Sequence, residues 1–256
     1  MKNEIRIFFT ALMFYTRIPC PANVGHSEEY INKSTRYFPL IGWIVGGCAA
    51  LAIYLLHFIF PDAVCIILSL AASVLLTGAF HEDGFADVCD GFGGGWTKEK
   101  IMEIMKDSRI GAYGAIGLIL LFALKIAVLI GLMQLDLWFC LKSVMLAHVL
   151  SRFAAVTAIF THPYSREDAS SKIKPIAKQL SAKELAVSSI WVFPALLLFL
   201  NLWIVLALLP AYAVKMYMSH YFARWIGGYT GDCLGAIQQA SELAILLFCL
   251  GIWKFI

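Results

Sequence analysis

Long apolar segments alternate with short polar connections along most of the chain. Five of these segments have about the 20 residues that an α-helix needs to cross a bilayer; they are 37–60, 62–80, 110–133, 138–161 and 235–253. Segment 185–218 is also apolar, but one helix of that length would measure about 51 Å against a hydrocarbon core of about 30 Å. Asn201 near its middle therefore predicts a hairpin of two shorter helices. The pattern predicts an all-α integral membrane protein, a polytopic bundle of about seven transmembrane helices.

Composition supports this interpretation. Hydrophobic residues make up 61% of the chain and charged residues only 14%, whereas soluble domains average about 25% charged residues. No polar stretch is long enough for a second, soluble domain, so residues 1–256 are interpreted as a single integral catalytic domain. The net charge of +3 is too small to indicate a nucleic-acid partner. The seven cysteines form no CxxC pair and are interpreted as packing thiols.

Lysine and arginine are confined to alternate connections. None lies at Pro61, in 134–137 or around Asn201. The remaining connections carry nearly all of them: Lys2, Arg6, Arg17, Lys33, Arg36, Lys98, Lys100, Lys106, Arg109, Arg166, Lys172, Lys174, Lys178, Lys183 and Arg224. Because basic loops stay on the cytoplasmic side of a membrane, the asymmetry predicts a cytoplasmic N-terminus and cytoplasmic active-site loops.

The stretch HEDGFADVCDG (81–91) places four carboxylates directly after an apolar segment. If it continues the second helix, Asp83, Asp87 and Asp90 fall at i, i+4 and i+7, within an arc of about 60°. Glu82 points elsewhere and is expected to matter less. Three carboxylates on one face repel each other unless a cation lies among them, and oxygen ligands suit Mg²⁺ or Mn²⁺. These three aspartates are therefore predicted to bind a divalent metal, Mg²⁺, at the catalytic centre.

Glycines and basic residues follow the acidic stretch. GFGGG (91–95) contains Gly93, Gly94 and Gly95, and glycine permits close approach of the backbone to a ligand. Lys106 and Arg109 come shortly after and can neutralise phosphate oxygens. A solvated loop is the alternative interpretation. The grouping of acids, glycines and bases within a short stretch favours a phosphoryl-transfer site with these bases as catalytic residues.

A second polar group is GGYTGDCLGAIQQASE (227–242). Asp232 and Glu242 share roughly one helical face, and Glu242 falls inside the last apolar segment, where an ionisable residue indicates function by default. Arg152 in the fourth segment needs an acidic partner, for which the aspartate cluster is a candidate. Arg152, Asp232 and Glu242 are interpreted as substrate-binding residues, whereas Lys125 is interpreted as a snorkelling lysine.

The run HEDGFADVCDGFGGGWTKEKIMEIMKDSRIGAYG (81–114) strongly resembles the signature of the adenosylcobinamide-GDP ribazoletransferases, the cobalamin (5′-phosphate) synthases. Shorter segments resemble the same family in the same order: RIPCP (17–21), YFPLIGWIVGG (37–47), HPYSREDASSK (162–172) and GGYTGDCLGAIQQASEL (227–243). The acidic run is the specific part, and the resemblance covers most of the chain.

This resemblance implies an enzyme of the bacterial inner membrane. It would join adenosylcobinamide-GDP to α-ribazole or α-ribazole 5′-phosphate, releasing GMP, with Mg²⁺. In that reaction Lys106 and Arg109 would hold the diphosphate, and Asp90 would deprotonate the attacking 5′-hydroxyl. Membrane lipid would surround the protein, and self-association into a homo-oligomer is left open.

Two alternatives are weighed against this hypothesis. A CDP-alcohol phosphatidyltransferase-like membrane phosphotransferase also uses an acidic DG-containing motif, but it places an arginine soon after the DG and then GxxxD, unlike the order after Asp83-Gly84. A secondary transporter also carries intramembrane acids on broken helices. It would place them near the midplane in paired repeats, whereas this chain collects them at the predicted cytoplasmic ends.

Overall fold

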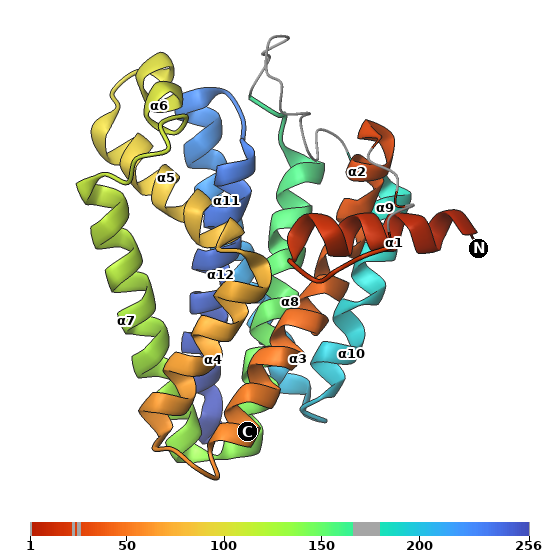
Figure 1. Cartoon of the computed structure of the whole chain (residues 1–256), viewed down its shortest axis with the longest axis vertical. Helices are drawn as coiled ribbons and strands as arrows, with labels where there is room; N and C mark the ends of the chain where they lie inside the picture. Colours follow the sequence, from red (N-terminus) through yellow and green to blue (C-terminus); the bar gives the residue numbers. More distant parts are fainter. Residues whose placement is uncertain (1, 22–23, 25–26, 166–179, 256) are drawn as a thin grey trace.

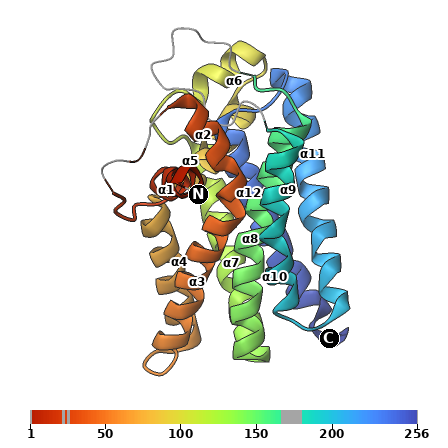
Figure 2. The ribbon, with the colours of Figure 1, turned by 90° about the vertical axis from the view of Figure 1, so that its right-hand side faces the viewer.

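Six long helices form the body of the molecule. The computed structural model describes residues 2–21, 24, 27–165 and 180–255, and in that part of the chain the only β-type pairing is an isolated bridge between Tyr164 and Tyr229. The long helices lie side by side in Figures 1 and 2: α3 (Phe38–Leu56), α4 (Asp62–Thr77), α7 (Ala112–Leu135), α8 (Leu137–Thr161), α11 (Leu208–Ile226) and α12 (Gly231–Ile252). The all-α prediction is confirmed.

Five helical segments in the described part are long and apolar enough to cross a membrane. They are Glu29–Leu56, Ala112–Leu135, Leu137–Thr161, Leu202–Ile226 and Gly231–Phe255. A sixth is added if α4 and α5 (Phe80–Gly94), which are bent by 91° relative to each other, count as one broken span. The chain is therefore a multi-pass membrane protein, although the predicted count of seven spans is not confirmed.

Segment 185–218 breaks where the sequence predicts it to break. Leu200 has a φ of 49°, and the side chain of Asn201 accepts a hydrogen bond of 2.9 Å from the backbone N–H of Trp203 at the start of the 3₁₀ helix η2 (Leu202–Ala207). The first half of the segment is two short helices, α9 (Ala182–Ile190) and α10 (Val192–Leu197). Neither is long enough to cross a bilayer alone, which accounts for the missing seventh span.

The acidic stretch is helical, but it does not continue the second long helix as expected. Helix α4 ends at Gly78, whose φ is 68°, and Ala79 follows with a φ of 59°. Two successive left-handed residues turn the chain, and glycine adopts this conformation without steric cost. The missing side chain of Gly78 also leaves room for the guanidinium of Arg17. The acidic helix α5 therefore leaves the bundle axis at an elbow.

Close packing of α3 and α8 depends on Gly42 and Gly46. A Cβ atom on Gly42 would lie 2.5 Å from the backbone oxygen of His148, and one on Gly46 would lie 2.9 Å from the His148 Cβ. These two glycines therefore allow α3 to approach the backbone of α8. Gly47 meets nothing within 4 Å and has no packing role. All seven cysteines are free thiols, as expected.

The two ends of the bundle differ. At the upper end of Figure 1 lie the α5–α6–α7 connection, with α6 at Lys98–Ile104, the start of α9, and the α11–α12 connection. The lower end holds the α3–α4 and α7–α8 turns and the C-terminal 3₁₀ helix η3 (Trp253–Phe255).

The N-terminal helix α1 (Lys2–Tyr15) crosses α3 instead of joining the bundle; α2 (Glu28–Ser34) and η1 (Thr35–Tyr37) lead into α3. Of the basic residues used to predict orientation, Arg166, Lys172, Lys174 and Lys178 lie outside the described residues.

Candidate active site

The acidic helix α5 presents its three aspartates to different environments. Asp83 is exposed, Asp87 is partly exposed, and Asp90 is only 9% exposed. Their i, i+4, i+7 spacing on one continuous helix is retained. Exposure therefore decreases along the helix away from the elbow, so that Asp83 and Asp87 face the surface and Asp90 faces the protein.

Asp90 binds the N-terminus of helix α7. Its Oδ2 accepts a hydrogen bond of 2.7 Å from the backbone N–H of Gly111, and its Oδ1 accepts one of 2.8 Å from that of Gly114. A Cβ atom on either glycine would collide with this carboxylate. The negative charge also complements the positive end of the helix dipole. Asp90 thus holds α7 against α5, and each of its two carboxylate oxygens accepts one of these hydrogen bonds.

The contact of Asp90 with α7 removes it from the predicted set of metal ligands. In the described part of the chain no three His, Cys, Asp or Glu side chains gather closely enough to hold a metal ion. The expected cluster of Asp83, Asp87 and Asp90 is therefore not formed as one ligand set. Their helical spacing is correct, but Asp90 is turned towards the backbone of α7 because the helix N-terminus competes for its carboxylate.

The N-terminus of α12 brings Asp232 against the acidic helix. A Cβ atom on Gly84 would lie 2.9 Å from the Cα of Asp232, so the two backbones touch at this point. Asp232 is partly exposed, in the first turn of α12, and the Thr230 side chain caps that helix by accepting a hydrogen bond from the N–H of Cys233. The structure thus places Asp232 beside the α5 segment that carries Asp83 and Asp87, two regions that are far apart in sequence.

The two predicted phosphate-binding cations lie on the α6–α7 connection. The Arg109 side chain is 85% exposed and forms a two-pronged pair with Asp107, with Nη2–Oδ2 at 2.7 Å and Nε–Oδ1 at 3.1 Å. Hydrogen bonds from Arg109 hold the pKa of the Asp107 carboxyl below its usual value. Lys106 is also exposed. Both cations are accessible at the same end of the bundle as α5 (Figure 1), although Arg109 already has a carboxylate partner.

The three glycines predicted to contact substrate differ in their surroundings. A Cβ atom on Gly93 would lie 2.6 Å from the ring of Tyr113, and one on Gly95 would lie 2.8 Å from the oxygen of Gly91. These two glycines therefore serve helix packing. Gly94 is exposed and has only an ordinary contact with Ile104, at 3.4 Å, so it alone of the three has an open side.

Glu242 is the centre of a buried polar network inside the bundle. One of its oxygens lies 2.6 Å from Lys125 Nζ. The other accepts a hydrogen bond of 2.7 Å from Gln238 and lies 3.2 Å from His148 Nδ1 and 4.0 Å from Arg152 Nη1. Arg152 is 1% exposed and Glu242 is 3% exposed. The acidic partner of Arg152 is thus Glu242 and not the aspartate cluster, and the burial of both side chains argues against direct contact with a substrate.

One further expectation about this network is corrected, and a second side chain joins the network. Lys125 is not a snorkelling lysine, since it is 2% exposed and its amine is held by Glu242 and Gln239. Glu82 does point away from the aspartate face, but it is 8% exposed and accepts a hydrogen bond of 2.8 Å from Gln239. The pairing of Lys125 with Glu242 could have been predicted from the sequence. Each is an ionisable residue within an apolar segment, and charges inside a membrane require partners.

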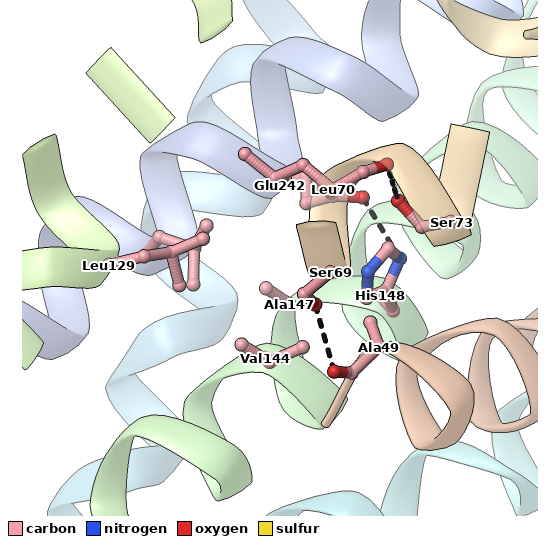
Figure 3. Close-up of a pocket in the computed structure, with 10 residues that line it drawn as sticks. Ala49, Ser69, Leu70, Ser73, Leu129, Val144, Ala147, His148 and Glu242 are labelled. Atoms are coloured by element: carbon pink, nitrogen blue, oxygen red, sulfur yellow. Dashed lines mark hydrogen bonds and ion pairs between the residues drawn. The ribbon is translucent and has the colours of Figure 1, made fainter. Parts of the chain in front are cut away.

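A small cavity borders the network within the bundle. Figure 3 shows Glu242 and His148 in its lining together with Ser69 and Ser73 of α4, and Leu129 and Val144 among the apolar residues. Its volume of about 10 Å³ is close to what a single water molecule needs. A substrate of nucleotide size cannot enter such a space.

Comparison with known proteins shows the family of the chain. The family model for cobalamin-5-phosphate synthase matches residues 7–250. The chain belongs to the cobalamin-5-phosphate synthase family. An adenosylcobinamide-GDP ribazoletransferase from Leptospira interrogans is 44% identical over 258 residues, covering 98% of this chain and 96% of the relative. Proteins of the same name from Shewanella amazonensis and Vibrio parahaemolyticus are 44% and 39% identical, each covering 99% of this chain and 98% and 95% of the relative.

This member of the cobalamin-5-phosphate synthase family is therefore a transferase of cobalamin biosynthesis. The match favours the predicted family over both the CDP-alcohol phosphatidyltransferase and the transporter alternatives. No solved structure matches the chain. The acidic run on which the resemblance rests, 81–114, covers nearly all of α5, the whole of α6 and the start of α7.

Proposed function

We propose that this protein joins adenosylcobinamide-GDP to α-ribazole or α-ribazole 5′-phosphate at the exposed end of α5. The observation that carries the proposal is the elbow at Gly78 and Ala79. It turns the acidic helix away from α4, so that Asp83 and Asp87 lie beside the N-terminus of α12 and at the same end as the α6–α7 connection. Carboxylates, accessible cations and a helix N-terminus are the groups that a diphosphate substrate requires.

The reaction balances as a phosphoryl-group transfer. In α-ribazole 5′-phosphate the 5′-oxygen already carries a phosphate, so the attacking group is not the 5′-hydroxyl expected from the sequence. A ribose hydroxyl that is free in both acceptors attacks the phosphorus that is attached to cobinamide, forming a new P–O bond. The bond between that phosphorus and the oxygen bridging to the second phosphorus breaks, and GMP leaves with the bridging oxygen. The hydroxyl proton of the ribazole is released. Accessible Lys106 and Arg109 would stabilise the charge on the departing phosphate.

We propose Asp83 and Asp87 as the protein ligands of Mg²⁺. Mg²⁺ in phosphate-transfer sites is held by one or two carboxylates together with substrate phosphates, so two accessible carboxylates one helical turn apart fit this ion. Asp232, which lies against Gly84, is the next available oxygen donor. When bound, the ion would neutralise phosphate charge. Asp90 is not proposed as the general base, because its oxygens are occupied by Gly111 and Gly114.

The proposed location is the bacterial inner membrane, with the α5 end facing the cytoplasm. Support comes from the basic residues of the α5–α7 and α11–α12 connections, which share one end of the bundle. The opposite turns, at Pro61 and Asn201, have no lysine or arginine, and basic loops remain cytoplasmic.

Reconstitution of the purified protein tests the proposed function. Detergent-solubilised protein would be incubated with adenosylcobinamide-GDP, α-ribazole and Mg²⁺, and both GMP and adenosylcobalamin would be quantified by chromatography. Equal amounts of the two products are expected, with none when α-ribazole is omitted. GMP formation that does not depend on α-ribazole would indicate a hydrolase and contradict the proposal.

A further inference from the structure

A chain of short hydrogen bonds runs from helix α7 through α12 to the acidic helix α5. The Lys125 amine donates to Gln239 Oε1 at 2.6 Å, and Gln239 Nε2 donates to Glu82 Oε1 at 2.8 Å. Lys125 is anchored in turn by Glu242, also at 2.6 Å. Lys125, Gln239 and Glu82 are 2%, 2% and 8% exposed. This chain of hydrogen bonds is therefore shielded from water. In such surroundings hydrogen bonds are stronger than in water, and a polar group left without one is costly.

The two ends of the chain fix the orientation of the Gln239 amide. An ammonium group can only donate, so it selects the amide oxygen. An ionised carboxylate can only accept, so Glu82 selects the amide nitrogen. Gln239 cannot flip without losing both interactions. The side chain of Gln239 thus transmits the position of Lys125 and α12 to Glu82.

Glu82 precedes Asp83 in the first turn of α5, and its contact therefore sets the rotation of the helix. One helical residue corresponds to about 100° of rotation, so fixing Glu82 towards α12 turns Asp83 and Asp87 away from the network and towards the surface. The backbones also meet here, since a Cβ atom on Gly235 would lie 3.1 Å from the oxygen of His81. Asp90 holds the far end of α5 through its hydrogen bonds with Gly111 and Gly114, and the Glu82–Gln239 contact holds the end that carries Asp83.

We infer that Gln239 and Lys125 are positioning residues that hold α5, through Glu82, in the rotation at which Asp83 and Asp87 face the substrate site. The catalytic consequence rests on the proposed function, whereas the rotation of α5 is a property of the fold. This chain of hydrogen bonds touches no substrate and acts only by fixing the geometry of the acidic helix. Small misplacements of catalytic groups are expensive, so loss of this contact should reduce turnover.

Cys89 offers a direct readout of the α5 rotation. It is a half-buried thiol on α5, and a Cβ atom on Gly117 of α7 would lie 2.7 Å from its Sγ. Rotation of α5 would release this thiol from α7 and increase its rate of alkylation. Half-buried Cys20 and exposed Cys48 would be replaced by serine, so that the four thiols remaining besides Cys89 are all buried and should react slowly.

The experiment compares Gln239→Leu with Gln238→Leu. Gln238 is the control, because it is an equally buried neighbour on the same helix that donates to Ser151 and Glu242 and has no hydrogen bond to α5. It also accepts a hydrogen bond of 2.9 Å from Gln239 Nε2, so its replacement removes that bond and leaves the Gln239–Glu82 bond in place. Gln239→Leu should raise the alkylation rate of Cys89 about fivefold or more, since local opening governs access. Gln238→Leu should lower the melting temperature in detergent and leave alkylation unchanged. Equal alkylation rates in both variants would overturn the inference.

A second pair of variants, at Glu82, shows whether a raised alkylation rate comes from loss of the contact or from misfolding. The transferase assay then tests the catalytic consequence apart from the rotation. Glu82→Gln keeps an acceptor for Gln239 and should retain wild-type alkylation, whereas Glu82→Leu should behave like Gln239→Leu. In the transferase assay, Gln239→Leu and Glu82→Leu should lower kcat about tenfold or more, given the usual cost of misplacing catalytic groups. Increased alkylation with unchanged kcat would refute the catalytic consequence. If wild-type protein makes no adenosylcobalamin, the proposed function fails while the alkylation rates still test the rotation.

Discussion

Lys125 Nζ lies 2.6 Å from Glu242 Oε1, and the two side chains come from α7 and α12, both in segments capable of crossing a membrane. At 2% and 3% exposure, neither charge can be stabilised by water. Such a pair persists because each charge inside a bilayer needs an internal partner. The pair therefore fixes α7 against α12 at a depth where apolar packing alone has little directional preference.

Removal of one charge from this pair should destabilise the bundle. In Glu242→Gln, Lys125 and Arg152 lose their shared carboxylate, and breaking a buried pair typically costs roughly 3–5 kcal/mol. We expect a lower midpoint of thermal unfolding in detergent. The double variant Lys125→Met with Glu242→Gln removes both charges and should lose less stability than the sum of the two single variants. Additive losses would show that the two side chains do not interact.

Asp87→Asn and Asp90→Asn should separate chemistry from structure. Asp87→Asn removes a proposed metal-ligand charge, and a loss of about a thousandfold or more in turnover is expected with the melting temperature unchanged. Asp90→Asn weakens the carboxylate contacts with Gly111 and Gly114, and loss of such a helix-terminal contact costs about 1 kcal/mol. Both variants would be measured by turnover against Mg²⁺ concentration and by thermal unfolding. Near-normal turnover of Asp87→Asn at low Mg²⁺ would exclude Asp87 as a ligand.

Arg109 is expected to contact the diphosphate of the donor. Arg109→Lys should raise the KM for adenosylcobinamide-GDP and leave that for α-ribazole unchanged, because lysine lacks the planar two-pronged geometry. Asp107→Asn removes the carboxylate that competes for Arg109 and should lower the donor KM at low ionic strength. Steady-state kinetics with each substrate varied in turn provide the measurement. An equal change in both KM values would contradict the assignment.

The pH dependence of the Arg109–Asp107 pair has a defined sign. Hydrogen bonds from Arg109 lower the pKa of Asp107 below its ordinary 3.8. A lowered carboxyl pKa means that the pair is intact above the ordinary value and separates only as the pH falls through the lowered one. The donor KM should therefore show no change attributable to Asp107 between pH 6 and pH 9, a range in which the pair stays charged. A change in that range that disappears in Asp107→Asn would show that the carboxyl titrates there.

Single cysteines at the two ends of the bundle should report the orientation. Ser108→Cys lies on the exposed α6–α7 connection, and Asn201→Cys lies at the opposite turn. In intact cells an impermeant thiol reagent should label the cysteine at position 201, and it should label the one at 108 only after permeabilisation. The reverse result would overturn the predicted cytoplasmic orientation.

Gly84→Ala and Gly94→Ala should differ although both lie on α5. A Cβ atom at position 84 would be 2.9 Å from the backbone of Asp232, which cannot move as a flexible side chain can. At position 94 the nearest atom is the end of the Ile104 side chain, at 3.4 Å. Gly84→Ala should lower stability by about 1–3 kcal/mol, the usual cost of overpacking. Gly94→Ala should leave thermal stability unchanged, so that any increase it causes in donor KM would indicate substrate contact at that glycine.

Periodicity and composition by themselves determined the fold class and most of the helices. Apolar segments as long as those over α7, α8 and α12 have few stable alternatives, because a membrane requires every backbone hydrogen bond to be made within the segment. The acidic run also identified the family and the helix that carries it. Asn201 marked a real break for a local reason, since its side chain caps the following turn.

Tertiary structure decided the partners of the charged residues and the direction of the acidic helix. The residues after Ala79 are helical whether the chain continues straight or bends by 91°, because the two conformations differ only at Gly78 and Ala79. The sequence of the acidic helix therefore does not show its direction. Asp90 has the same spacing as a metal ligand, yet the N-terminus of α7 takes its carboxylate. Lys125 and Glu242 lie far apart in the chain and meet only when α7 and α12 pack together, since a buried charge is satisfied by whichever opposite charge the fold brings within reach.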